Sequence, residues 1–134
     1  LPADHPLLHR PRLQLSDLAD EPFVLYGAQA VPGLHAMALL ACQQAGFVPR
    51  VQQEAVQVQT VVSLVESGLG VALVPSVAMR HANRAVAFRR LHGPGSRTEI
   101  GIALVWRPDS ETPSARRFRE TVEGLAGHPP HDWP

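Results

Sequence analysis

The sequence predicts an α/β domain with a mainly parallel sheet and helices on both faces. Short, continuous apolar runs at 22–26, 71–75 and 100–107 have the length of buried strands. Along the chain they alternate with segments in which apolar residues recur every three or four positions, which is the period of a helix. Strands that alternate with helices of about ten residues are typical of βαβ units. Because the apolar runs lack apolar–polar alternation, we expect helices to cover both faces of the sheet.

The first 33 residues are expected to hold one helical turn and one strand. Residues 1–14 carry three prolines and no regular period, so they are predicted to be a loop or linker. The stretch SDLADEP predicts a helical turn that is capped by Ser16 and ends before Pro22. The run PFVLY (22–26) predicts a buried strand, and GAQAVPG (27–33) predicts a loop.

Two helices separated by a strand are expected in the middle of the chain. The first helix is predicted from Leu34 to Ala45, with Gly46 as its C-terminal cap. Its apolar stripe comprises Leu34, Met37, Ala38, Ala41 and Ala45. A strand is predicted at 50–55, and a second helix follows it and ends at Gly68. The stripe of this second helix comprises Val58, Val61, Val62 and Val65.

The remaining elements continue the alternation. A strand at 71–75 is followed by a short helix at 76–82, a strand at 85–91 and a turn at 92–96. The run IGIALVWR (100–107) is the longest apolar candidate for a strand. A final helix is predicted to begin at Pro113, with one face formed by Ala115, Phe118, Val122 and Leu125.

Composition excludes several classes of protein. The 134 residues suit one domain by length, and twelve basic residues balance twelve acidic ones, so this chain alone is not expected to bind nucleic acid. All the basic residues are arginine, which excludes chemistry that needs a lysine amine. The single cysteine, Cys42, is predicted to be a buried, inert thiol. No membrane span or signal peptide is recognisable, so a cytoplasmic location is expected. The sequence starts without methionine, and we expect it to be part of a longer protein.

The stretch SLVESGLGVALVP (63–75) resembles a functional loop but is predicted to be structural. A nucleophile elbow needs Gly-x-Ser-x-Gly between a strand and a helix, whereas here Ser67 directly precedes Gly68 and follows a helix. A dinucleotide loop needs glycines that open onto a helix, but Gly68 and Gly70 lead into a strand. The two glycines therefore indicate a helix cap and a tight connection.

Histidines and carboxylates show no pattern of a metal or catalytic site. His5 and His9 are four positions apart, but Pro6 between them disrupts a metal-binding helix face. The other histidines have no visible carboxylate partner or lie in a proline-rich tail: His35, His81, His92, His128 and His131. The paired carboxylates are interpreted as solvated helix charges: Asp17 with Asp20, and Glu120 with Glu123. No catalytic residue, metal ligand or cofactor is predicted.

Two helix starts are the best candidates for a binding site. Helix N-termini carry free N–H groups and about half a positive charge, so they favour anions. One start is Pro32-Gly33-Leu34, and the other is the segment 57–60, QVQT. Both follow predicted strands, and ligands of open α/β sheets bind at the carboxyl ends of the strands. The alternative interpretation is two ordinary loops.

Four stretches, taken in order, closely resemble the effector-binding domain of LysR-type transcriptional regulators. They are LPADHPLL, DLADEPFVLY, ACQQAGFVPRV and QTVVSLVESGLGVALVPSVA, and the match runs from residue 1 to about 126. The resemblance implies two Rossmann-like subdomains of the periplasmic-binding-protein type with a small-molecule effector between them. Residues 1–12 would end the first subdomain and form the hinge, 13–93 would form the second subdomain, and 94–134 would hold the crossover strand, the last helix and the tail.

The same resemblance implies the partners and the site. The N-terminal helix-turn-helix of the family is missing here, so DNA would be contacted only through that missing part. Family members usually pair through these domains, which implies a homodimer that uses the helix 34–45. The loop LYGAQAVPGL is most similar to regulators of aromatic-compound breakdown, whose effectors are aromatic acids or dicarboxylates. Close relatives usually carry a polar side chain at the position of Gly33, from which this sequence departs. The expected effector-binding residues are Tyr26, Gly27, Ala28, Pro32, Gly33, Leu34, Glu54, Gln57, Gln59 and Thr60. The alternative function is that of a periplasmic solute-binding protein, which has the same two-lobed architecture, and neither function is that of an enzyme.

Overall fold

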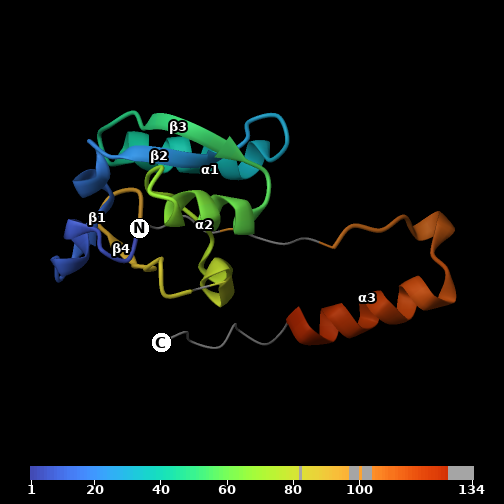
Figure 1. The fold of residues 1–134 in the computed structure, drawn as a ribbon. Helices are drawn as coiled ribbons and strands as arrows, with labels where there is room; N and C mark the ends of the chain where they lie inside the picture. Colours follow the sequence, from blue (N-terminus) through green and yellow to red (C-terminus); the bar gives the residue numbers. More distant parts are fainter. Residues whose placement is uncertain (82, 97–99, 101–103, 127–134) are drawn as a thin grey trace. The chain divides into compact units, whose positions relative to one another are not determined.

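The computed structural model of the protein describes residues 1–81, 83–96, 100 and 104–126, in two compact units (Figure 1). The first unit spans Leu1–Ile100, and the second spans Gly101–Pro134. In the described part of the chain, no helix combines the length and the apolar character that crossing a bilayer requires.

Two parallel strands form the centre of the first unit. They are β2 (Pro22–Tyr26) and β3 (Arg50–Ala55), and both confirm the predicted ranges. At the carboxyl end of the ladder Tyr26 lies opposite Ala55, and the register shifts by one residue after Phe23. The parallel pairing agrees with the predicted sheet type.

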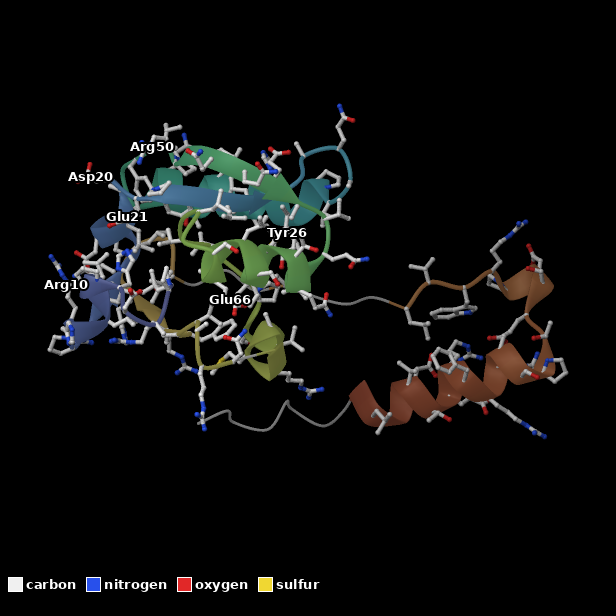
Figure 2. All side chains as sticks on the ribbon, in the orientation of Figure 1. Arg10, Asp20, Glu21, Tyr26, Arg50 and Glu66 are labelled. Atoms are coloured by element: carbon white, nitrogen blue, oxygen red, sulfur yellow. The ribbon has the colours of Figure 1, made fainter. Side chains whose placement is uncertain are left out.

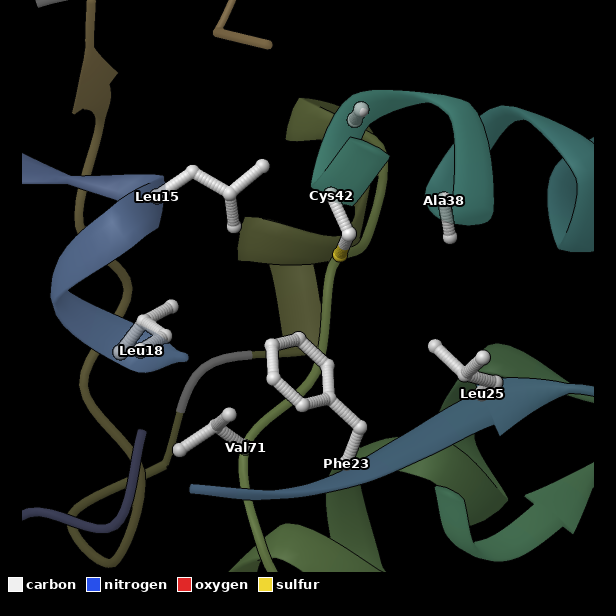
Figure 3. Packing of buried hydrophobic residues seen from close by; sticks show 8 residues of the cluster. Leu15, Leu18, Phe23, Leu25, Ala38, Cys42 and Val71 are labelled. Carbon is white, nitrogen blue, oxygen red and sulfur yellow. The ribbon is translucent and has the colours of Figure 1, made fainter. Parts of the chain in front are cut away.

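The two helices α1 (Pro32–Gln44) and α2 (Val58–Glu66) pack on opposite faces of β2, because successive side chains of a strand point to opposite sides. One cluster contains Phe23 and Leu25 with Leu15, Leu18, Ala38, Ala41, Cys42 and Val71 (Figure 3). The other contains Val24 and Tyr26 with Ala55, Val61, Val62, Val65 and Val86. The predicted coverage of both faces is therefore confirmed, and it explains why β2 is apolar at every buried position.

Glycine ends both helices as predicted. Gly46 has φ 90°, and its N–H donates to the carbonyl of Gln43 at 3.0 Å. Gly68 has φ 76° and donates to the carbonyl of Val65 at 3.0 Å. Both belong to Schellman motifs, in which a left-handed residue lets two N–H groups bind otherwise unpaired carbonyls. Helix α1 begins at Pro32, two residues before the predicted start, because the fixed φ of proline suits the first helical position.

The strand predicted at 71–75 is wrong. Only Val71 pairs with β2, through a parallel bridge to Phe23. The bridge has two backbone hydrogen bonds of 2.8 Å, from Val71 N to Pro22 O and from Val24 N to Val71 O. The chain makes no further pairing before Pro75, which lacks an N–H to donate.

The strand predicted at 85–91 is also largely wrong. Val86 forms a single antiparallel bridge with Pro2. Within residues 85–92 the one regular pairing is that of β4 (Leu91–His92) with β1 (Leu13–Gln14), in parallel. The predicted loop at 1–14 thus contains a short strand and the 3₁₀ helix η1 (Pro6–His9). Their partners lie about eighty positions away, beyond the reach of any local pattern.

Three short elements differ in detail from the predictions. The turn at 15–18 is the 3₁₀ helix η2 (Leu15–Leu18), and its cap is Gln14 with Asp17, not Ser16. The Asp17 carboxylate accepts from the Gln14 N–H at 2.9 Å, so this residue is structural rather than a solvated charge. The predicted helix at 76–82 is the 3₁₀ helix η3 (Ser76–His81), and residue 82 lies outside the described residues.

The second unit contains η4 (Pro108–Ser110) and the predicted final helix, α3 (Pro113–Ala126). Within this unit the Arg119 guanidinium lies 5.2 Å from the ring of Trp106 and pairs with Glu111 at 2.8 Å. The strand predicted at 100–107 is absent at residue 100 and at 104–107, and residues 101–103 lie outside the described part.

Candidate functional site at the carboxyl ends of β2 and β3

The loops that follow β2 and β3 begin side by side. The N–H of Gly27, the first residue after β2, donates to the carbonyl of Ala55, the last residue of β3, at 3.0 Å. Figure 2 labels Tyr26 at this end of the sheet and Arg50 at the opposite end, where β3 begins. Both loops lead directly into helices, so the starts of α1 and α2 follow the same edge of the sheet.

The start of α1 has no side-chain cap and no acidic residue in its first turn. Its first intrahelical bond runs from His35 N to Val31 O at 3.1 Å, so the N–H groups of Gly33 and Leu34 have no intrahelical acceptor. Gly33 is exposed, and a Cβ added to it would meet nothing within 4 Å. A ligand therefore has open access to the backbone at this helix start.

The start of α2 likewise has no side-chain cap. Its cap residue, Gln57, makes no side-chain hydrogen bond to the helix, and the first turn lacks an acidic residue. The first intrahelical bond runs from Val61 N to Gln57 O at 3.0 Å. The side chains of Gln59 and Thr60 in the first turn are exposed and offer neutral donors and acceptors.

The ten residues predicted for the site lie on the ends of β2 and β3, on the loops after them, and on the first turns of α1 and α2. Gly27 and Glu54 come close together, because a Cβ on Gly27 would lie 3.6 Å from Glu54 Oε2. The phenol of Tyr26 instead belongs to the core beside α2, where burial raises its pKa. Only the backbone carbonyl of Tyr26 faces this edge.

His35 is the residue that the sequence reasoning missed. Its Nδ1 lies 2.7 Å from the Tyr26 carbonyl and 3.8 Å from Glu54 Oε1, so the expectation that it lacks a carboxylate partner is wrong. Glu54 stands nineteen positions later in the chain, and only the pairing of β3 with β2 brings it near. A histidine at the fourth position of a helix, with an acidic residue near the end of the next strand, is the pattern that indicates such a contact.

Other groups that the sequence singled out are structural. The Ser67 hydroxyl donates to the Ser63 carbonyl at 2.9 Å, one turn back in α2. Cys42 is fully buried against Phe23, and burial raises its pKa to about 11. Within the described residues, no group of three or more His, Cys, Asp or Glu side chains is placed to hold a metal ion.

Parallel strands with helices on both faces are those of an α/β domain, consistent with the periplasmic-binding-protein-like fold. The chain belongs to the LysR substrate-binding domain family, whose model, described as "LysR substrate binding domain", matches residues 1–126.

The chain is similar to several transcriptional regulators of this family. It is 36% identical over 118 residues to the HTH-type transcriptional regulator AlsR of Bacillus subtilis (strain 168), covering 88% of this chain and 38% of that protein. It is 45% identical over 84 residues to the HTH-type transcriptional regulator CatR of Pseudomonas putida, covering 60% of this chain and 28% of that protein. A crystal structure of the C-terminal domain of a probable LysR family transcriptional regulator from Rhodococcus sp. RHA1 matches with a TM-score of 0.50 and 37% identity, covering 55% of this chain and 35% of that one.

These similarities support the prediction that the chain is the effector-binding domain of a LysR-type transcriptional regulator. They give no support to the alternative prediction of a solute-binding protein. The chain spans less than half of the length of the regulators named above. The similarity to the subgroup for aromatic-compound breakdown stays a prediction.

Proposed function

We propose that this domain binds a small, carboxylate-bearing effector at the starts of α1 and α2 and thereby alters transcription by the full-length regulator. The effector is an aromatic acid or a dicarboxylate, in keeping with the loop that precedes Gly33. DNA is contacted by a helix-turn-helix elsewhere in the full protein, which acts as a cytoplasmic homodimer and catalyses no reaction. In this proposal residues 1–12, 13–93 and 94–134 keep the roles of hinge, second subdomain and return to the first.

The observation that carries the proposal is the pair of uncapped helix starts after two hydrogen-bonded strands. Free N–H groups of the first turns, with about half a positive charge at each helix end, form a site for anions. Helix-end attraction contributes about 0.3–1 kcal/mol, whereas a hydrogen bond to a charged group contributes about 1.5–3 kcal/mol. The hydrogen bonds, and hence the placement of the carboxylate, therefore dominate selectivity.

Regulation follows when the effector binds one of two arrangements of the full protein more tightly than the other. An effector shifts an equilibrium only by its preference for one state. A change from mostly one state to mostly the other needs about 5.5 kcal/mol of preference. Two or three hydrogen bonds between a carboxylate and helix N–H groups that form in only one of the two arrangements would supply this amount.

The test is calorimetric titration of the full-length protein with benzoate and with hexa-2,4-dienedioate. Gly33→Leu covers the backbone at the start of α1, and Thr60→Val removes a hydroxyl from the first turn of α2. We expect at least one acid to bind, and each variant to bind it about ten- to a hundredfold more weakly, because one hydrogen bond to a charged group contributes about 1.5–3 kcal/mol.

Matched controls come from α3. Gly124→Leu also places leucine on an open helical glycine, and Thr121→Val also removes an exposed helical hydroxyl. Both controls are expected to keep wild-type affinity, and denaturant titration should show that the site variants remain folded. Unchanged affinity in both Gly33→Leu and Thr60→Val would contradict the proposed site.

A further inference from the structure

Residues 1–14 pair with residues 85–92 in two opposite directions. Pro2 forms an antiparallel bridge with Val86, whereas β1 runs parallel to β4 (Figure 1). The chain therefore changes its direction relative to residues 85–92 between these two pairings. This change falls within residues 4–12, where the structure has the short helix η1 and no strand pairing.

The Arg89 side chain holds the chain where its direction changes. Its guanidinium donates to the carbonyls of Leu8 and Arg10, and the second of these bonds measures 2.7 Å. A guanidinium offers five N–H donors in a rigid plane, so two bonds from one group fix both the position and the direction of the backbone that accepts them. Hydrogen bonds from a charged donor are also about twice as strong as neutral ones. Among the described residues, the structure gives Arg89 no carboxylate partner that would compete with the two carbonyls.

Residues just before Arg89 share a hydrophobic cluster with the candidate site. Val86 is buried in the cluster on the α2 side of β2. Val31, Leu34 and Val58, which lie at the starts of α1 and α2, pack against the same cluster. Close-packed side chains leave few voids, so one of them cannot shift without displacing its neighbours. A continuous series of contacts thus runs from both helix starts through Val86 to Arg89, and from Arg89 to the backbone of η1.

We propose that Arg89 is a positioning residue that couples the candidate effector site to residues 1–12. When an effector displaces the starts of α1 and α2, the packed cluster displaces residues 85–92, and the guanidinium moves the carbonyls of Leu8 and Arg10 with them. This inference rests on the proposed function, in which residues 1–12 form the hinge to the rest of the regulator. Arg89 acts through these carbonyls and does not contact the effector.

Hydrogen–deuterium exchange of the full-length protein, with and without benzoate or hexa-2,4-dienedioate, tests the coupling. Mass spectrometry of peptides from residues 27–35 and 56–62 reports binding, and peptides from residues 1–12 report its transmission. Exchange rates measure the local opening of each segment. In the wild type we expect the bound effector to change the exchange rates of both groups of peptides by about threefold or more.

Two variants of Arg89 and one matched control assign the coupling. Arg89→Met keeps an unbranched chain but has no donor, and the response of residues 1–12 should disappear while the binding peptides still respond. Arg89→Lys keeps the charge on a single ammonium group, and part of the response should remain. Arg90→Met makes the same substitution at the neighbouring, exposed arginine and should behave as wild type. Wild-type exchange rates in α1 and α2 without effector show that a variant is folded.

The outcomes separate this inference from the proposed function. A purely structural role of Arg89 would make residues 1–12 of Arg89→Met exchange faster without effector, while the effector changed their rates by the wild-type factor; that result overturns the coupling and leaves the effector site intact. A wild type whose binding peptides respond while residues 1–12 do not overturns the coupling as well. If neither acid changes the exchange of residues 27–35 and 56–62, the proposed site is wrong and the coupling fails with it.

Discussion

Replacing Gly70 by alanine should strongly destabilise the first unit. Gly70 has φ 150°, a backbone conformation that residues with a side chain rarely adopt. A Cβ at this position would lie 2.2 Å from Pro22 O and 2.7 Å from Pro22 C, both of which are backbone atoms. The Pro22 carbonyl cannot move away without losing the 2.8 Å hydrogen bond that it accepts from Val71 N.

The expected loss of stability is the sum of the backbone strain at residue 70 and the hydrogen bonds that are lost. Strained φ costs about 1–3 kcal/mol. Loss of the two bonds that hold Val71 to β2 costs about 0.5–1.5 kcal/mol each. We therefore expect the free energy of unfolding to fall by about 2–6 kcal/mol, out of the 5–15 kcal/mol that is typical of a native domain.

Urea denaturation followed by circular dichroism measures this loss. The matched control is Gly33→Ala, where an added Cβ meets nothing within 4 Å and alanine is the better helix former. That variant should gain about 0.5–1 kcal/mol. A Gly70→Ala protein whose unfolding free energy lies within about 1 kcal/mol of wild type would refute the steric reasoning.

Two further predictions concern ionisable groups. Burial raises the pKa of Cys42 to about 11. A disulfide reagent at pH 8 should therefore leave this thiol unmodified in the folded protein and modify it fully in denaturant. Rapid modification under native conditions would contradict the buried position. Hydrogen bonds from Arg119 and Arg116 lower the pKa of Glu111, so the stability that this carboxylate contributes is present above the ordinary carboxyl pKa and is lost as pH falls through the lowered value. Carboxyl ¹³C titration by NMR should show the Glu111 pKa rising in Arg119→Gln, and an unchanged titration in that variant would rule out the ion pair as the cause.

Sequence patterns predicted the elements whose stabilising contacts are local. The periodic stripes located α1, α2 and α3, and the apolar run and the glycine caps located β2 and both helix ends. The pairings that were missed join distant segments, as β1 joins β4 and Pro2 joins Val86. A local window contains only one partner of each such pair, so it cannot distinguish a short paired segment from a loop.

For the candidate site, the sequence located the helix starts but not the contacts between side chains. The positions of Gly33 and Thr60 in the first turns of helices were predicted because helix starts after strands follow from the order of the elements. The His35–Glu54 contact depends on the pairing of β3 with β2, and His5 similarly lies 3.5 Å from Glu21, whose partnership no spacing rule suggests. Histidine–carboxylate contacts of this kind need three-dimensional neighbours, which composition and period do not specify.

The Arg89 guanidinium donates to the carbonyls of Leu8 and Arg10, and the first of these contacts joins residues 81 positions apart. Ribosomes add about 5–20 residues per second, so Leu8 waits about 4–16 s after its synthesis for this donor to appear. The strands β2 and β3 and the helices α1 and α2 are synthesised before then, because all four lie upstream of Arg89. During biosynthesis the contacts of the first fourteen residues with residues 85–92 therefore form last, and a ribosome that stalls just after Glu66 would hold a chain that has α1, α2, β2 and β3 but lacks the partner strand of β1.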